Sequence, residues 1–323
     1  MVDPRRHREP SSAPVDEPVR VAFLAATGRS GSTLVARVLG SLPGTCSVGE
    51  LCWIWTYGVK LNRACGCGAT FSDCEFWSAV GQRAFGGWDR IDAEDAIGLR
   101  RELTKNRRVP ELFTHPTPGT ARTLNRYTAL MTPLYRAIKD ESGADVIIDN
   151  SKQAGVALVT RRTPGVSLEL IHLVRRSHGV AHSWSKHVAR SDNPGKEMRR
   201  RGPGRTALRW STDNALFEAF RTTDTPLTTM RYEDFVAAPV PSTKRLAEFL
   251  HIDPAAVDVI FPTEDSVELA TDHSVWGNPM RLRSGPEVLK ADEAWRAGMS
   301  SRDQREVTLL SWPALLRYGY LRQ

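Results

Sequence analysis

VRVAFLAATGRSGSTLVARVL, residues 19–39, is the stretch that decides the fold of this chain. Its first part, VRVAFLAA (19–26), is a short apolar run that ends at a glycine-rich turn, which predicts a buried strand. The following residues are apolar at positions 34, 35, 38, 39 and 42, the spacing of one helix face, and Pro43-Gly44 ends the pattern. A glycine-rich turn between a strand and a helix is typical of a loop that holds a phosphate group.

This loop lacks the lysine of a nucleoside triphosphatase. The triphosphate-binding pattern is G-x-x-x-x-G-K-S/T; with Gly31 on its second glycine, Ala26 stands at the first glycine and Ser32 at the lysine. Backbone N–H groups at a helix N-terminus and a planar guanidinium remain. We therefore predict an anion site made of Gly28, Arg29, Ser30, Gly31, Ser32 and Thr33. The alternative is a surface turn in which the glycines only allow tight geometry.

The order of elements along the chain predicts an α/β fold. Further strands are expected in ADVIIDNS (144–151), VSLELIHLVRR (166–176) and PLTTMRYEDF (226–235). Helices are expected at 92–103, 119–142, 178–190, 205–223 and 241–253, and from residue 286 to the C-terminus. The natural assembly is a central parallel sheet flanked by helices, with its ligand at the carboxyl ends of the strands.

The composition indicates how the chain is organised into domains. With 41% hydrophobic and 25% charged residues, the chain is typical of a soluble globular protein, and we expect one domain over residues 19–323. Residues 1–18 combine charge with proline and lack an apolar run, so we expect a disordered lead-in rather than a signal peptide. No run reaches the ~18 apolar residues that span a bilayer, which favours a cytoplasmic protein without membrane insertion. Residues 60–140 are predicted to be a helical insertion and 190–205, with six basic residues, a mobile loop.

The five cysteines lie in one window, at positions 46, 52, 65, 67 and 74. Cys52, Cys65, Cys67 and Cys74 are enough to ligate zinc, but the C-x-C spacing differs from the C-x2-C turn that zinc sites favour. We therefore favour reduced, structural cysteines and predict no metal requirement, while a metal site and a disulfide stay open.

A second group of polar residues follows the third predicted strand. Arg175 ends that strand, and Ser183 lies eight residues later in the following helix. A guanidinium and a hydroxyl at this spacing converge on one further phosphate beside the first loop. Taken singly, each residue is more simply a solvated strand-end charge or an ordinary helix hydroxyl. Together with the first loop, they indicate a ligand with two separate phosphate groups.

The combined pattern resembles the bacterial sulfotransferases, which use 3′-phosphoadenosine 5′-phosphosulfate (PAPS) and release PAP. GRSGST after the first strand resembles their 5′-phosphosulfate loop, and Arg175 with Ser183 resembles their 3′-phosphate site. IIDNSK, TMRYEDF, HSVWGNPMRLRSG and the cysteine-rich CGCG…CEFW resemble further segments of the family, over about residues 20 to 320. Two departures from many animal members are Arg29 in place of lysine and the absence of a K-T-H segment.

The resemblance implies a sulfuryl transfer from PAPS to a hydroxyl or amine of a small-molecule or glycan acceptor. Arg29, with Ser32 and Thr33, would stabilise the leaving phosphate. Glu50 resembles the general base, His115 is the alternative base, and Lys152, after Asp149 and Ser151, would hold the sulfate or the acceptor. No metal is implied, because arginine and lysine take the place of magnesium.

The resemblance also suggests where the rest of the ligands bind. We expect Tyr232 near the adenine and Arg281, Arg283 and Gly285 around the 3′-phosphate. Trp53 and Trp55 of LCWIWTYG, with the helical insertion, are expected to build the acceptor pocket; a place in the core is the alternative. Acceptor identity and oligomeric state are left open.

Two other classes of function compete with this interpretation. A small-molecule kinase with a P-loop is disfavoured by the missing G-K-S/T and by the lack of a clear magnesium-binding aspartate. A nucleic-acid-binding protein is compatible with the net charge of +7, but the basic segment 190–205 lacks interleaved aromatic residues. We therefore expect no nucleic-acid partner.

Overall fold

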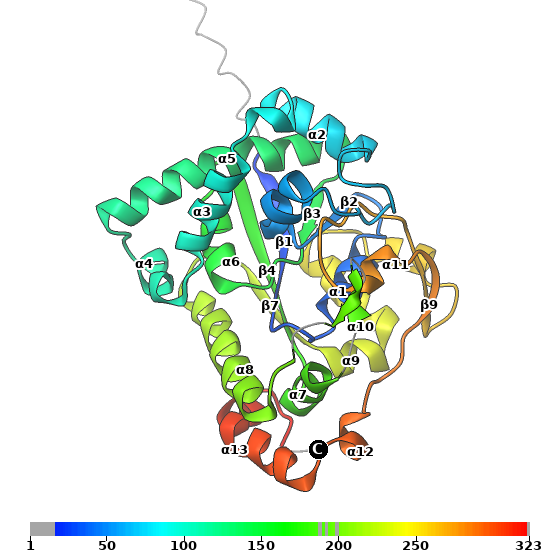
Figure 1. Ribbon diagram of the computed structural model, residues 1–323. Helices are drawn as coiled ribbons and strands as arrows, with labels where there is room; N and C mark the ends of the chain where they lie inside the picture. The colour runs from blue at the N-terminus through cyan, green and yellow to red at the C-terminus, as the bar shows by residue number, and fades with distance from the viewer. Residues whose placement is uncertain (1–16, 187–188, 191–192, 198–199, 322–323) are drawn as a thin grey trace, which may run out of the picture.

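The computed structural model describes residues 17–321 apart from 187–188, 191–192 and 198–199, so the predicted N-terminal lead-in lies almost entirely outside the described residues. Its centre is a five-stranded parallel sheet with the strand order β2-β3-β1-β4-β7 (Figure 1). The strands are β1 Val19–Ala26, β2 Thr45–Gly49, β3 Val146–Asp149, β4 Val166–Val174 and β7 Leu227–Arg231. The predicted α/β class with a central parallel sheet is confirmed.

Strand β1 shows why the sheet is covered on both faces. Val21, Phe23 and Ala25 pack into one hydrophobic core, whereas the alternating residues pack into a second core on the opposite face. Side chains of a strand alternate between the two faces, so a nearly continuous apolar run requires helices on both sides. The apolar run VAFLAA therefore specifies a central strand of a three-layer fold.

The helices form two layers and an additional group at one end of the sheet (Figure 1). One layer consists of α2 Glu75–Phe85, α3 Ala93–Leu103, α5 Pro118–Ser142 and α6 Ala154–Arg161. The other consists of α1 Ser32–Leu39, α9 Tyr232–Ala237, α10 Pro239–Phe249 and α11 Ala256–Ile260. The additional group, at the bottom of Figure 1, contains α7 Ser177–Ser185, α8 Pro203–Glu218, α12 Trp295–Gly298 and α13 Ser301–Arg317. None of the described helices is long and apolar enough to cross a membrane.

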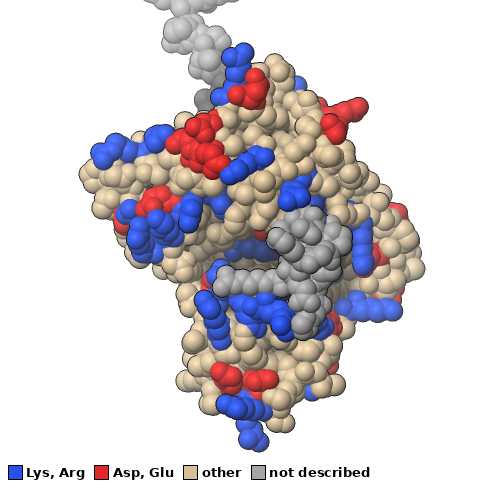
Figure 2. Space-filling view, viewed as in Figure 1, with Lys and Arg blue, Asp and Glu red and all other residues tan. Residues whose placement is uncertain are grey.

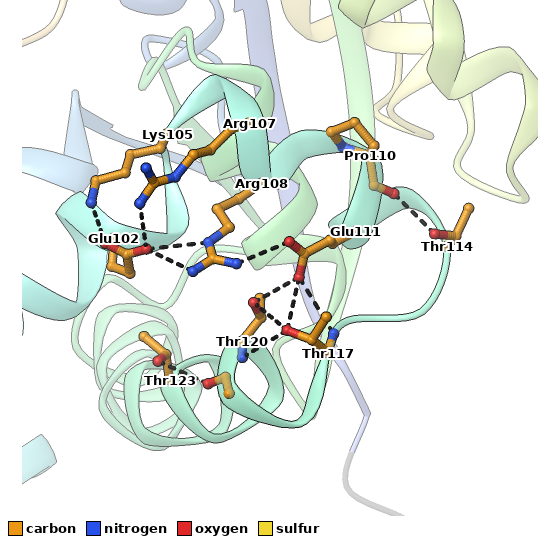
Figure 3. Close-up of polar contacts among 11 residues, drawn as sticks. Glu102, Lys105, Arg107, Arg108, Pro110, Glu111, Thr114, Thr117, Thr120 and Thr123 are labelled. Atoms are coloured by element: carbon orange, nitrogen blue, oxygen red, sulfur yellow. Dashed lines mark hydrogen bonds and ion pairs between the residues drawn. The ribbon is translucent and has the colours of Figure 1, made fainter.

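A polar network fixes the corner between α3, the short helix α4 (Val109–Phe113) and α5 (Figure 3). Arg108 donates hydrogen bonds to Glu102 and to Glu111, each at 2.9 Å. Glu111 also accepts a hydrogen bond from the Thr120 hydroxyl at 2.7 Å. The hydrogen bonds from Thr120 and Arg108 lower the pKa of Glu111 to about 2. The network therefore joins α3 and α4 to the start of α5.

The sheet has one strand that the sequence pattern did not reveal. Strand β2 (TCSVG) follows Pro43-Gly44 and pairs with β3 at the edge of the sheet. Only its second half is buried, so it shows neither a long apolar run nor a clear alternation. Its position matters for function because Glu50 follows it directly.

Several predicted boundaries were wrong. The strand expected over 226–235 ends at Arg231, and Tyr232–Ala237 form α9, whose first turn contains Glu233 and Asp234, as a helix N-terminus favours. Residues Gly285–Val288, expected at the start of a helical region, form β9, which pairs with β8 (Ser266–Leu269).

Part of the basic loop expected over 190–205 forms strands and a helix. Ala189–Arg190 (β5) and Asn193–Glu197 (β6) form an antiparallel pair, and α8 already begins at Pro203. Proline at the first helical turn is well tolerated there because the missing N–H has no partner in any helix. Residues 191–192 and 198–199 of this predicted loop lie outside the described residues.

Candidate active site

A cavity of about 490 Å³ lies where β1, β2 and β3 end. Figure 2 shows a hollow on the viewed face with lysine and arginine side chains around it. The residues that line the cavity are Gly28, Arg29, Gly31, Ser32, Thr33, Leu34, Glu50, Trp53, Lys152, Trp184, Tyr232, Trp276, Gly277, Asn278, Met280, Glu287, Val288, Leu289 and Lys290. The carboxyl ends of the strands thus form the ligand site, as expected for an open parallel sheet.

The loop after β1 is shaped by two residues with left-handed backbone conformations. Arg29 has φ 75°, and Gly31, which precedes α1, has φ 82°. A Cβ atom added to Gly31 would lie 2.2 Å from Cε2 of Tyr232, so both this contact and the positive φ favour glycine at this position. Ser32 and Thr33 begin α1 and line the cavity, and the first N–H groups of a helix are available to bind an anion.

Three hydroxyl groups in the loop after β1 lack protein partners. The side-chain oxygen atoms of Thr27, Ser30 and Ser32 are buried, and none has a hydrogen-bond partner among the described residues; of the three residues, Ser32 lines the cavity. A buried hydroxyl without a partner is costly, and such groups are rare unless a ligand or water satisfies them. Next to the guanidinium of Arg29 and the N-terminus of α1, the Ser32 hydroxyl fits an oxygen atom of a phosphate or phosphosulfate group.

Glu50 and Lys152 form an ion pair in the cavity. Glu50 follows β2 and Lys152 follows β3, and Nζ of Lys152 lies 2.5 Å from Oε1 of Glu50. Only 13% of the Lys152 side chain and 16% of the Glu50 side chain are exposed. Burial lowers the pKa of Arg29, and the negative charge of Glu50 opposes this shift. The cavity therefore combines a shielded carboxylate with two cations, Arg29 and Lys152.

Asp149 stabilises the backbone turn that carries Lys152. It is fully buried and accepts hydrogen bonds from the amide and hydroxyl of Ser151, at 2.9 and 2.5 Å, and from the Tyr135 hydroxyl at 2.9 Å. Burial raises its pKa to about 6. These bonds fix the turn after β3, in which Lys152 has a φ of 62°. Asp149 and Ser151 thus position Lys152 and do not line the cavity.

Arg175 contacts the loop after β1 but does not line the cavity. Its guanidinium donates to the Arg29 carbonyl at 3.1 Å and to the Asp292 carboxylate at 3.0 Å, and lies 4.9 Å from the centre of the Tyr232 ring. Ser183, on α7, is half-buried and does not line the cavity. The structure therefore places Arg175 beside the first loop as predicted, but its charge is already paired with Asp292.

The residues near the C-terminus that were predicted to bind the 3′-phosphate lie outside the cavity, and the two arginines among them contact other protein groups. Arg281 is buried and donates to the Ser274 carbonyl at 3.0 Å, while the exposed Arg283 forms an ion pair with Glu287. Gly285 opens β9. None of these three predicted residues lines the cavity; the same segment contributes Lys290 and the stretch from Trp276 to Asn278 instead.

Of Trp53, Trp55 and His115, one residue lines the cavity. Trp53 lines it, with the guanidinium of Arg100 4.0 Å from its ring centre. Trp55 is fully buried and donates to the Tyr127 hydroxyl at 3.3 Å, so this residue is part of the core, contrary to its predicted role. His115 is exposed between α4 and α5 and does not line the cavity, so it is not placed as an alternative base.

Two tryptophans that line the cavity were not predicted from the sequence. Trp184 donates from Nε1 to the Gly28 carbonyl at 3.0 Å, and the Arg29 guanidinium lies 5.4 Å from its ring centre. Trp276 stacks on Tyr57 at 3.6 Å, and its carbonyl accepts from the Glu50 amide at 3.1 Å. Trp184 follows Ser183 in the helix expected over 178–190, and Trp276 lies in the motif HSVWGNPMRLRSG, so an aromatic residue inside each segment was the available signal.

Comparisons with known proteins bear on the fold. No family model matches the chain, and no curated protein matches it. Among solved structures, the sulfotransferase domain of the olefin synthase of Synechococcus PCC 7002 is similar over 95% of this chain and 98% of its own, with 19% identity and a TM-score of 0.51. The sulfotransferase domain of the curacin biosynthetic pathway matches 91% of this chain and 98% of its own, with 18% identity and a TM-score of 0.44.

A third match is the sulfotransferase STF9 of Mycobacterium avium, with 14% identity, a TM-score of 0.40, and coverage of 78% of this chain and 70% of its own. The similarity to the olefin synthase domain extends over nearly the whole of both chains and includes the central parallel sheet. The expectation raised by the sequence motifs is thereby confirmed at the level of architecture. This chain has the fold of a sulfotransferase domain.

Proposed function

We propose that the protein is a sulfotransferase that moves the sulfuryl group of PAPS to a hydroxyl or amine of a small-molecule or glycan acceptor. The observation that carries this proposal is the arrangement of one cavity, in which the Glu50–Lys152 pair lies beside a loop with Arg29 and buried, unpartnered serine hydroxyls. The fold similarity and the order of the sequence motifs support it.

The loop after β1 would hold the 5′-phosphosulfate of the donor. N–H groups at the start of α1, with the hydroxyl of Ser32, donate to its oxygen atoms, and Arg29 neutralises the charge of the leaving phosphate. Arg175 acts as a positioning residue, because its hydrogen bond to the Arg29 carbonyl supports the left-handed conformation of the loop. Lys290, which also lines the cavity, supplies a further cation for a phosphate of the donor.

Glu50 is the proposed general base. One of its carboxylate oxygens contacts Lys152, which leaves the second oxygen for the proton of the acceptor. In the transfer, the bond from sulfur to the phosphate oxygen breaks as the bond from sulfur to the acceptor oxygen or nitrogen forms. The acceptor proton moves to Glu50, and the negative charge stays on the phosphate beside Arg29. Lys152 stabilises the charge on the transferred group.

The acceptor would enter along the aromatic wall. Trp53, Trp184 and Trp276 line the cavity next to Glu50 and the loop. Apolar and aromatic walls with a few polar groups are the usual design of a small-molecule site. The aromatic lining fits the flat face of a phenol or the apolar face of a sugar ring.

A transfer assay with two labelled donors tests this proposal. The protein is incubated with sulfur-labelled PAPS, and in parallel with γ-phosphate-labelled ATP and magnesium, against a panel of phenols, sugars and amines. We expect label to move from PAPS to an acceptor and none to move from ATP. Transfer from ATP without transfer from PAPS would instead identify a kinase.

A further inference from the structure

A cluster of three cysteines and one histidine lies outside the active-site cavity. Cys65, Cys67 and Cys74 meet His273, which is about 200 residues further along the chain, and their ligand atoms all lie within 4.8 Å of one another. The Sγ atom of Cys74 lies 3.6 Å from that of Cys65 and 3.7 Å from that of Cys67. Nδ1 of His273 lies 3.3 Å from the Cys74 sulfur and 3.7 Å from the Cys65 sulfur.

We propose that these four residues bind a structural zinc ion. Zinc in proteins is tetrahedral, with bonds of about 2.3 Å to sulfur and about 2.0 Å to nitrogen, which require sulfur–sulfur separations of about 3.8 Å and sulfur–nitrogen separations of about 3.5 Å. The two sulfur–sulfur distances to Cys74 and the two distances from Nδ1 of His273 lie within about 0.2 Å of these values. The remaining two separations are within 4.8 Å. A disulfide would bring two sulfur atoms to about 2.05 Å. Three thiolates and an imidazole are a ligand set that zinc prefers over magnesium or calcium.

The local backbone presents the cysteine side chains to one point. The Cys65 amide donates to the Ala69 carbonyl at 2.8 Å, and the Gly68 amide donates to the Cys65 carbonyl at 3.0 Å, which closes a tight turn around Cys67. Gly68 has φ 93°, a conformation that favours glycine. Cys74 precedes α2 directly, and a helix N-terminus stabilises a thiolate. The turn therefore assembles three ligands although it lacks the C-x2-C spacing.

His273 is held from two sides. Its ring stacks on Phe76 with the ring centres 4.4 Å apart, and its carbonyl accepts a hydrogen bond from Nε1 of Trp77 at 2.9 Å. The Gly66 amide donates to the Ser274 carbonyl at 3.0 Å, and a Cβ atom at Gly66 would lie 2.2 Å from Oδ1 of Asp272. The turn and the 272–274 segment therefore touch closely, with Nδ1 of His273 facing the sulfur atoms.

The ligand set indicates a structural rather than a catalytic metal. Four protein side chains complete the coordination of zinc and leave no position for water or substrate. The site joins the cysteine turn to the segment that continues into Trp276, Gly277 and Asn278, which line the active-site cavity. Zinc would thus hold one wall of the cavity against the cysteine turn and the start of α2. This role is independent of the reaction that the cavity performs.

Metal analysis of the purified full chain tests the zinc site without any donor or acceptor. By mass spectrometry of the metals, we expect about one zinc per chain in the wild type and less than about a tenth of that in Cys67→Ser and in His273→Ala. Cys46→Ser is the matched control, because it removes a half-buried thiol outside the cluster and should keep the zinc. Wild-type protein with stoichiometric iron, or with a disulfide between cluster cysteines, would overturn the proposal.

Cobalt titration of chelator-treated wild type gives a readout that does not depend on variants. We expect the visible absorption bands of a tetrahedral cobalt–thiolate complex, saturating at about one equivalent and lost on addition of zinc. Zinc removal should also increase the rate of proteolysis around residues 270–280, which re-addition of zinc reverses. No cobalt–thiolate bands, together with unchanged alkylation rates of the thiols in the presence of zinc, would refute the site.

Discussion

Glu50 and Lys152 owe their contact to the order of the sheet. Strands β2 and β3 are neighbours, so the residues that follow them emerge side by side at the carboxyl edge. The backbone N–H of Asn150 donates to the Gly49 carbonyl at 2.8 Å, so the hydrogen bonding between the two strands continues as far as the ion pair. A buried ion pair is costly to form and costly to break, and such pairs commonly mark functional sites.

Replacing Glu50 by glutamine removes the proposed base with little change in shape. Because the amide cannot accept the acceptor proton, we expect transfer from PAPS to fall by about 10²- to 10⁴-fold. PAP affinity should change little, because the loop after β1 is unaltered. Steady-state transfer and calorimetric titration with PAP measure the two effects separately.

Glu287→Gln is the matched control for this experiment. Glu287 also lines the cavity, but it pairs with Arg283 and lies on β9, away from the loop. We expect it to retain transfer within about threefold, as is usual for changes at a partly exposed ion pair. Normal turnover by Glu50→Gln would show that the base assignment is wrong.

Gly31 is predicted to be the most sensitive residue of the loop. Alanine would adopt φ 82° at a cost and would place its Cβ 2.2 Å from Tyr232, so Gly31→Ala should lower the free energy of unfolding by about 1–3 kcal/mol. PAP binding should fall with it. Urea unfolding measures the first effect and calorimetry the second.

Gly98→Ala provides the comparison for that substitution. Gly98 lies inside α3, and a Cβ atom there would meet no atom within 4 Å. Alanine is the better helix former, so we expect this variant to be up to about 1 kcal/mol more stable than the wild type. Equal stability of the two variants would contradict the account of the loop.

At the scale of elements, the network around Glu111 couples α3, α4 and α5. Because the pKa of Glu111 is lowered in the folded state, this residue contributes its full stabilisation when the pH is above the ordinary pKa of glutamate. This contribution is lost as the pH falls towards about 2. Glu111→Gln should therefore lower the melting temperature at pH 7, and the difference from wild type should shrink between pH 5 and pH 3. A difference that is constant over this range would contradict the proposed network.

Sequence patterns predict the central elements well and the edges poorly. Strands β1, β3 and β4 are flanked by neighbours on both sides, so their residues are apolar and their patterns are clear. The edge strand β2 has five residues and is buried only in part, which leaves no pattern to detect. Strand β7, at the other edge, was found, but its end was misplaced because TMRYEDF contains no turn residue at the change from strand to helix.

At the scale of the whole molecule, the site depends on contacts between distant segments. The loop after β1 and Lys152 were predictable because each follows a strand that the sequence reveals, whereas Glu50, which follows the unpredicted strand β2, was suggested by the family resemblance. The pairing of Arg175 with Asp292, the burial of Trp55 and the closeness of His273 to the cysteine turn were not predictable. These depend on packing between segments far apart in the chain, 117 residues for Arg175 and Asp292 and 72 residues for Trp55 and Tyr127, which a local pattern does not encode.

Calorimetric titration with PAP, compared with ATP and magnesium, tests whether the loop with Arg29 holds the 5′-phosphate of a PAPS-type donor beside Glu50. We predict that wild-type protein binds one PAP, that Arg29→Met weakens this binding by about 10- to 100-fold, and that ATP with magnesium binds far more weakly than PAP. Binding of ATP with magnesium as tight as that of PAP, or PAP affinity that is unchanged in Arg29→Met, would contradict the account.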